Sequence, residues 1–75
     1  MTDRFTFCGF DTRTEALIFE RTLACDAAKL KAALDPNEIA DDPDIAHVYP
    51  IAIESVRVFT GEDVPAGDYF VNGVQ

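Results

Sequence analysis

The chain has 75 residues, of which 48% are hydrophobic and 11% aromatic, and its formal net charge is −8 at pH 7. This length fits one domain, residues 1–75, that is large enough for a small hydrophobic core. The negative charge argues against nucleic-acid binding, which needs a basic face. The sequence contains neither an 18-residue apolar run nor a cationic N-terminal flank before an apolar segment, so we expect a cytoplasmic protein without a membrane span.

The first half of the chain predicts an antiparallel hairpin. Residues 4–10 combine aromatic and β-compatible side chains, and residues 15–22 form a second run of the same kind. The polar residues 11–14 between the two runs have turn chemistry, because Asp and Thr side chains bond to nearby backbone amides. Two strands joined by so short a connection predict a hairpin.

A helix is expected over residues 27–34, where apolar side chains recur at helical spacing and Asp26 can cap the N-terminus. Pro36 should end it, because the residue before a proline avoids helical backbone angles. The following acidic stretch, residues 35–44, is expected to be mostly loop.

The segment 51–60 is compatible with two structures. Val and Ile on both faces allow a buried strand, whereas the spacing of Ile53, Val56 and Phe59 makes one helical stripe, which Gly61 would end. We favour the helix. Residues 62–67 should form a loop, and residues 68–74 should close the chain as a third strand.

Together these elements predict an α+β fold, a three-stranded antiparallel sheet covered by two helices in the order ββααβ. A lone hairpin is marginal in water, so the third strand and the helices are needed to cover its apolar side. The expected core comprises Phe5, Phe7, Leu17, Phe19, Leu30, Leu34, Ile53, Val56, Phe59, Tyr69 and Phe70.

No residue pattern predicts an enzyme, a metal site or a cofactor. Cys8 and Cys25 do not form a CxxC pair, and without an export signal we expect reduced thiols. His47 is the only histidine in the sequence, so zinc would lack a second imidazole, and we expect a surface or structural role. Ser55 is not part of a nucleophile motif, and the glycines are too dispersed for a phosphate-binding loop.

The negative charge lies in the second half of the sequence. Residues 1–34 contain five acids and five bases, whereas residues 35–75 contain nine acids and one base. Five acids fall within ten residues, Asp35, Glu38, Asp41, Asp42 and Asp44. Two interpretations are open, a solvated loop that aids solubility or a patch that binds a basic partner.

The order of short motifs resembles a family of short, acidic, functionally uncharacterised bacterial domains. The motifs are Phe10, Asp11 and Thr14; Leu17, Ile18, Phe19 and Glu20; Leu30 and Leu34; Asp41, Asp42 and Pro43; Tyr49, Pro50 and Ile51; and Asp68, Tyr69 and Phe70. Residues 52–60 depart from the family's pattern, because they are richer in β-branched side chains than its second helix. The resemblance implies an α+β domain of bacterial origin, of a kind similar to the immunity proteins encoded beside secreted toxins, and it carries over no catalytic residue.

The leading functional hypothesis is an inhibitor or immunity protein that occludes a basic toxin or nuclease. The five clustered acids would meet its Lys and Arg residues, and Tyr49 would be a buried anchor. The variant of this hypothesis is a phage-encoded inhibitor of a host defence protein. The alternative class is a structural or assembly module, a homodimer paired through residues 69–71 at the edge of the sheet.

Overall fold

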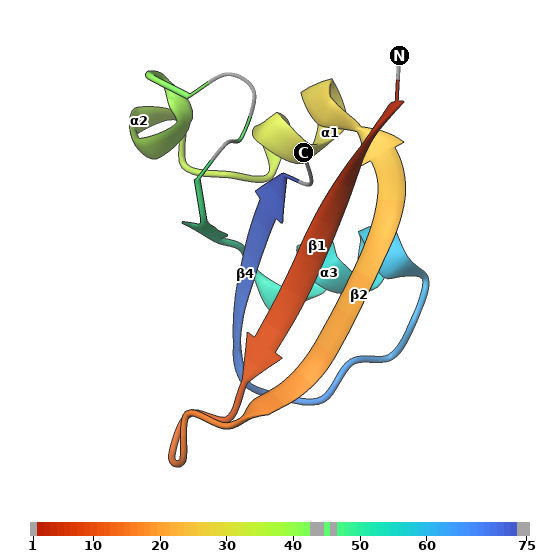
Figure 1. Cartoon of the computed structure of the whole chain (residues 1–75), viewed down its shortest axis with the longest axis vertical. Coiled ribbons are helices and arrows are strands. Elements are labelled where there is room, and N and C mark those ends of the chain that lie inside the picture. Colours follow the sequence, from red (N-terminus) through yellow and green to blue (C-terminus); the bar gives the residue numbers. More distant parts are fainter. Residues whose placement is uncertain (1, 43–44, 46, 74–75) are drawn as a thin grey trace.

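The computed structural model describes residues 2–42, 45 and 47–73 (Figure 1). In chain order the elements are β1 (Thr2–Phe10), β2 (Leu17–Asp26), α1 (Ala27–Ala32), α2 (Pro36–Ile39), β3 (Tyr49–Pro50), α3 (Ile53–Thr60) and β4 (Asp68–Gly73). The described strands form one antiparallel sheet in the order β2-β1-β4-β3. The predicted α+β class with an antiparallel sheet is therefore confirmed. The three-stranded sheet and the order ββααβ are wrong.

The additional helix α2 and the additional strand β3 each contain a proline. Pro36 is the first residue of α2, where its missing N–H costs no helical bond, so it starts a helix; α1 already ends at Ala32. Pro50 pairs with Phe70 in the edge strand β3, a position where a strand tolerates proline. The stretch expected to be mostly loop thus contains a helical turn, and residues 49–50 extend the sheet.

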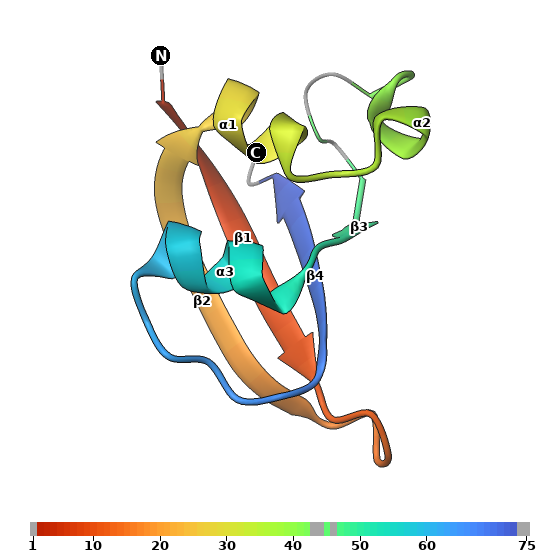
Figure 2. The same cartoon turned by 180° about the vertical axis from the view of Figure 1, so that it is seen from behind.

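One face of the sheet carries the core. Phe5, Phe7 and Gly9 of β1 are buried on this face, and alternate residues between them lie on the other. Figure 2 shows α3 lying across the core face, whereas Figure 1 shows the opposite face without a covering helix. Phe70, predicted in the core, lies on the uncovered face and meets Phe10 edge to face at a centroid distance of 5.9 Å.

A β-bulge explains why Leu17 is not in the core as predicted. Gly9 pairs with Phe19, but the next residue, Phe10, pairs with Leu17, so Ile18 is an extra residue in β2. Paired residues share a face of the sheet, so the bulge places Leu17 with Phe10 and away from Phe19. Leu17 is 52% exposed, whereas Phe19 is buried.

Within the segment 51–60, residues 53–60 form the favoured helix, and Ala52 is its N-cap. Gly61 ends α3 with a left-handed φ of 68°, and its N–H donates to the Arg57 carbonyl at 2.9 Å. Val56 of this helix is fully buried, and the Phe59 ring stacks on the Phe7 ring at a centroid distance of 5.9 Å. The helix therefore attaches to the centre of the sheet through the stripe that its spacing predicted.

The core also contains residues that the sequence did not mark. They are Ile39, Ile45, Tyr49, Ile51, Val64 and Val71. Most come from the connections around β3 and the loop after α3. These residues complete the core cluster together with side chains of the sheet and the predicted helices.

Candidate protein-binding surface

The acidic stretch begins with a short, well-capped helix. The Asp35 carboxylate accepts from the Asn37 N–H at 2.9 Å, and the Asp35 carbonyl accepts from Glu38 and Ile39. Ile39 is buried in the core and anchors the turn. Sequence and fold thus combine to hold the acidic residues of this segment in a defined arrangement.

Three of the predicted site residues lie on the exterior of this turn. Asp35, Glu38 and Asp41 are exposed; Asp35 caps α2, Glu38 lies within it, and Asp41 follows its C-cap Ala40. We call these three residues the acidic turn. In the part of the chain that the structure describes, none of them forms an ion pair with a cationic side chain.

Asp42 is different, because it is buried. Its Oδ2 accepts from the His47 backbone N–H at 2.9 Å and from the Tyr49 hydroxyl at 2.7 Å. The same oxygen lies 2.8 Å from His47 Nδ1. We call Asp42, His47 and Tyr49 the Asp42 node. It joins the end of the acidic turn to β3 across five to seven residues of chain.

The node holds a phenol beside negative charge. A hydrogen bond to the Asp42 carboxylate, with burial and the nearby charges of Asp42, Glu38 and Asp41, raises the pKa of Tyr49 to about 12. Tyr49 is thus a neutral donor at ordinary pH.

The six predicted contact residues therefore divide into groups. Asp35, Glu38 and Asp41 lie within one short segment around α2 and are accessible. Asp42 and Tyr49 are also together, but both are buried and bonded to each other, so in the free protein neither presents a surface for contact. Asp44 lies outside the described residues.

Two other acids of the second half, Glu62 and Asp63, lie close to arginine side chains. Arg21 forms two hydrogen bonds to the Glu62 carboxylate, at 3.0 and 3.1 Å, and Arg57 lies 3.6 Å from Asp63. The acidic turn lacks such partners among the described side chains. Its negative charge is thus directed at solvent, where it can act on an approaching cation.

The side chains considered for chemistry lie apart. Burial, with the nearby Glu20 charge, raises the pKa of the Cys8 thiol, which disfavours the nucleophilic thiolate. Cys8 and Cys25 are not joined in a disulfide. Within the described residues, no three His, Cys, Asp or Glu side chains converge as metal ligands.

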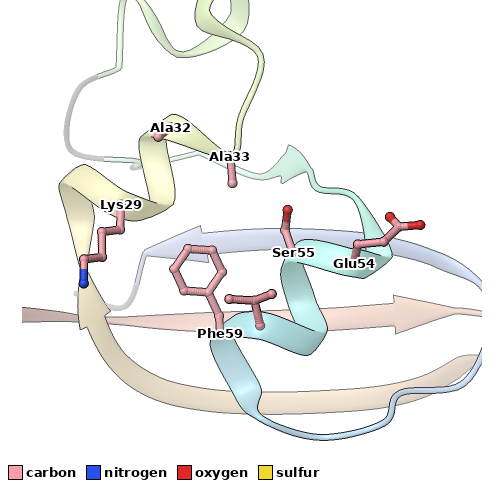
Figure 3. A pocket seen from close by; sticks show the side chains of 7 residues that line it. Lys29, Ala32, Ala33, Glu54, Ser55 and Phe59 are labelled. Carbon is pink, nitrogen blue, oxygen red and sulfur yellow. The ribbon is translucent and has the colours of Figure 1, made fainter.

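A second surface feature, which sequence reasoning did not find, is a groove of about 420 Å³ between α1 and α3 (Figure 3). Its lining residues are Lys29, Ala32, Ala33, Glu54, Ser55, Val58 and Phe59. Two segments more than twenty residues apart form it, so periodicity within either segment could not reveal it. The available signal was Val58, an apolar residue outside the buried stripe of its helix.

We compared the chain with protein-family models, curated proteins and solved structures. No protein-family model matches it, and neither curated proteins nor solved structures give a match. Among the described residues, the helices are too short or too polar to cross a membrane.

Proposed function

We propose that this domain is a small protein-binding inhibitor of the immunity type, whose acidic turn covers a basic surface of a toxin or nuclease. The observation that carries the proposal is the set of exposed carboxylates at Asp35, Glu38 and Asp41, which lack ion-pair partners among the described side chains. Nucleases bind phosphate groups through Lys and Arg side chains, and the same side chains also bind carboxylates. The carboxylates of the acidic turn could therefore take the place of phosphate groups on such a surface.

Preorganisation supports this role. The Asp35 cap, the buried Ile39 and the Asp42 node hold the backbone on both sides of the acidic turn. A surface that is ordered before binding loses less conformational entropy in the complex than a flexible acidic loop does. The solubilising interpretation does not require such anchoring.

The proposed mechanism is occlusion without chemistry. Long-range attraction between the acidic turn and a cationic cleft would raise the association rate, and close packing would then exclude substrate. Tyr49 enters this mechanism as a support rather than as an anchor, because its hydroxyl fixes Asp42 inside the domain. The resemblance to small acidic bacterial domains supports the same class of function, and a phage-encoded inhibitor would act by the same physics.

The test removes charge without removing the helix cap. The variant Asp35→Asn, Glu38→Gln, Asp41→Asn keeps side-chain size, and Asn caps a helix as well as Asp does. We expect it to lose most capture of basic proteins from the source cell at low salt, and to slow association with a captured nuclease by roughly tenfold.

The matched control is Glu15→Gln, Glu20→Gln, Asp68→Asn, which removes the same charge from exposed positions outside the acidic turn. It should capture the same proteins as the wild type. Equal capture by the acidic-turn variant and the wild type would refute the proposal, and equal loss in both variants would reduce it to an effect of net charge.

A further inference from the structure

An aromatic side chain that packs against the core lines the groove between α1 and α3. This side chain is Phe59, which is partly buried and stacks on Phe7 of strand β1. Ala32 and Ala33 on the α1 side leave the groove open because their side chains are small (Figure 3). This geometry accepts an apolar side chain from another helix.

The same groove also presents an apolar side chain. Val58 lines it and is 79% exposed, more than any other large hydrophobic residue in the described part of the chain. Val58 follows Glu54 by four residues, so both lie on one face of α3. The surface therefore contains both an apolar projection and an apolar hollow.

The charged residues of the groove are arranged at its two ends. Figure 3 shows Lys29 of α1 at one end and Glu54 of α3 at the other, on either side of Phe59. Neither forms an ion pair among the described residues. A two-fold axis between the ends would place each Lys29 opposite the Glu54 of a second copy, and each Glu54 opposite the second copy's Lys29.

We propose that a second copy of this chain occupies the groove and that the domain forms a symmetric dimer through α1 and α3. Two-fold interfaces are self-complementary, since each contact occurs twice. Here one rotation satisfies two ion pairs and brings each Val58 to the partner's groove. A different protein would need its own charges and apolar side chain to match this groove, whereas a second copy of this chain already has Lys29, Glu54 and Val58.

This interface differs from a dimer through residues 69–71. Strand β4 lies between β1 and β3, and beside β3 the Ile51 N–H donates to the Tyr69 carbonyl at 3.0 Å. Those residues are therefore not the edge that the sequence predicted. None of the three residues of the acidic turn lines the groove, so the dimer does not depend on the proposed inhibitor function.

The size of the surface predicts weak association. Stable complexes bury about 800 Å² on each partner, which would be a large share of the 4850 Å² surface of this domain. We expect contacts limited to the short helices α1 and α3 to bury less than this, and we therefore expect a dissociation constant of about 0.1–1 mM. Sedimentation equilibrium up to about 1 mM should show a mass rising from 8.3 kDa toward twice that value.

Charge exchange provides the decisive experiment. Lys29→Glu and Glu54→Lys each place like charges opposite one another in a homodimer, so each variant alone should remain monomeric. In a mixture of the two variants, one chain carries two carboxylates at these positions and the other carries two ammonium groups, so a heterodimer should form. Both positions are exposed, so circular dichroism should show folded monomers.

Val58→Asp tests the apolar part and should weaken association at least tenfold, whereas Val48→Asp, at another exposed valine, should leave it unchanged. A wild-type mass that stays at 8.3 kDa up to about 1 mM would overturn the proposal and leave the groove to a different protein. A dimer that forms in every variant would overturn it as well, because association would then use another surface.

Discussion

At the residue scale, Asp42 shows how burial changes the role of an acidic side chain. It belongs to the same acidic stretch as Asp41, yet it is only 8% exposed, and its carboxylate accepts from the Tyr49 hydroxyl and the His47 backbone. A buried carboxylate must be bonded in this way, because its desolvation is otherwise costly. Adjacent acids in the sequence thus have opposite roles, one internal and one directed at solvent.

Asp42→Ala should therefore destabilise the domain by about 2–4 kcal/mol, since it removes the acceptor of a buried hydroxyl and leaves that donor unsatisfied. Chemical denaturation followed by circular dichroism measures this loss. Asp41→Ala is the matched control and should change stability by less than about 0.5 kcal/mol. A loss for Asp42→Ala as small as that for Asp41→Ala would show that the Asp42 node contributes no stability.

At the element scale, the β1–β2 hairpin was predicted correctly in kind but not in register. Both strands are longer than the predicted runs, and the bulge after Gly9 changes which side chains of β2 face the core. Alternation predicts faces only while pairing is regular, and one extra residue reverses the alternation beyond it. The buried face of helix α3 does not depend on pairing with another segment, because its apolar stripe and the Gly61 that ends it lie in one stretch of sequence.

The bulge predicts different costs for two neighbouring apolar residues. Phe19→Ala should reduce stability by about 3–5 kcal/mol, because the ring is buried and contacts Tyr69 at a centroid distance of 5.9 Å. Leu17→Ala should cost less than about 1 kcal/mol, because this residue is already half in water. Thermal and urea unfolding of both variants would check the register, and a larger loss at Leu17 would contradict it.

At the scale of the whole molecule, the net charge of −8 acts on stability as well as on binding. Charges of one sign repel within a small folded domain, and salt screens that repulsion. Binding to a basic partner responds in the opposite direction, because salt screens the attraction. Stability and association should therefore change in opposite ways as salt increases.

Raising NaCl from about 20 mM to about 300 mM should accordingly increase the stability of the domain by about 0.5 kcal/mol, or roughly 2–4 °C in melting temperature. The variant Asp35→Asn, Glu38→Gln, Asp41→Asn should respond less, since it has fewer charges to screen. Scanning calorimetry of both proteins, with KCl as a check for ion-specific effects, measures the difference. A melting temperature that falls with salt would show that local ion pairs, such as Arg21 with Glu62, outweigh the general repulsion.

The sequence by itself determined the α+β class, the hairpin, two of the helices and the accumulation of acids after residue 34. These properties follow from local periodicity, capping residues and composition, which act within a few turns of chain. Only the tertiary structure decided which acids are exposed, because Asp42 meets Tyr49 through the path of the chain around β3. Folding likewise created the bulge and the groove between α1 and α3, since each depends on segments that the chain brings together from a distance.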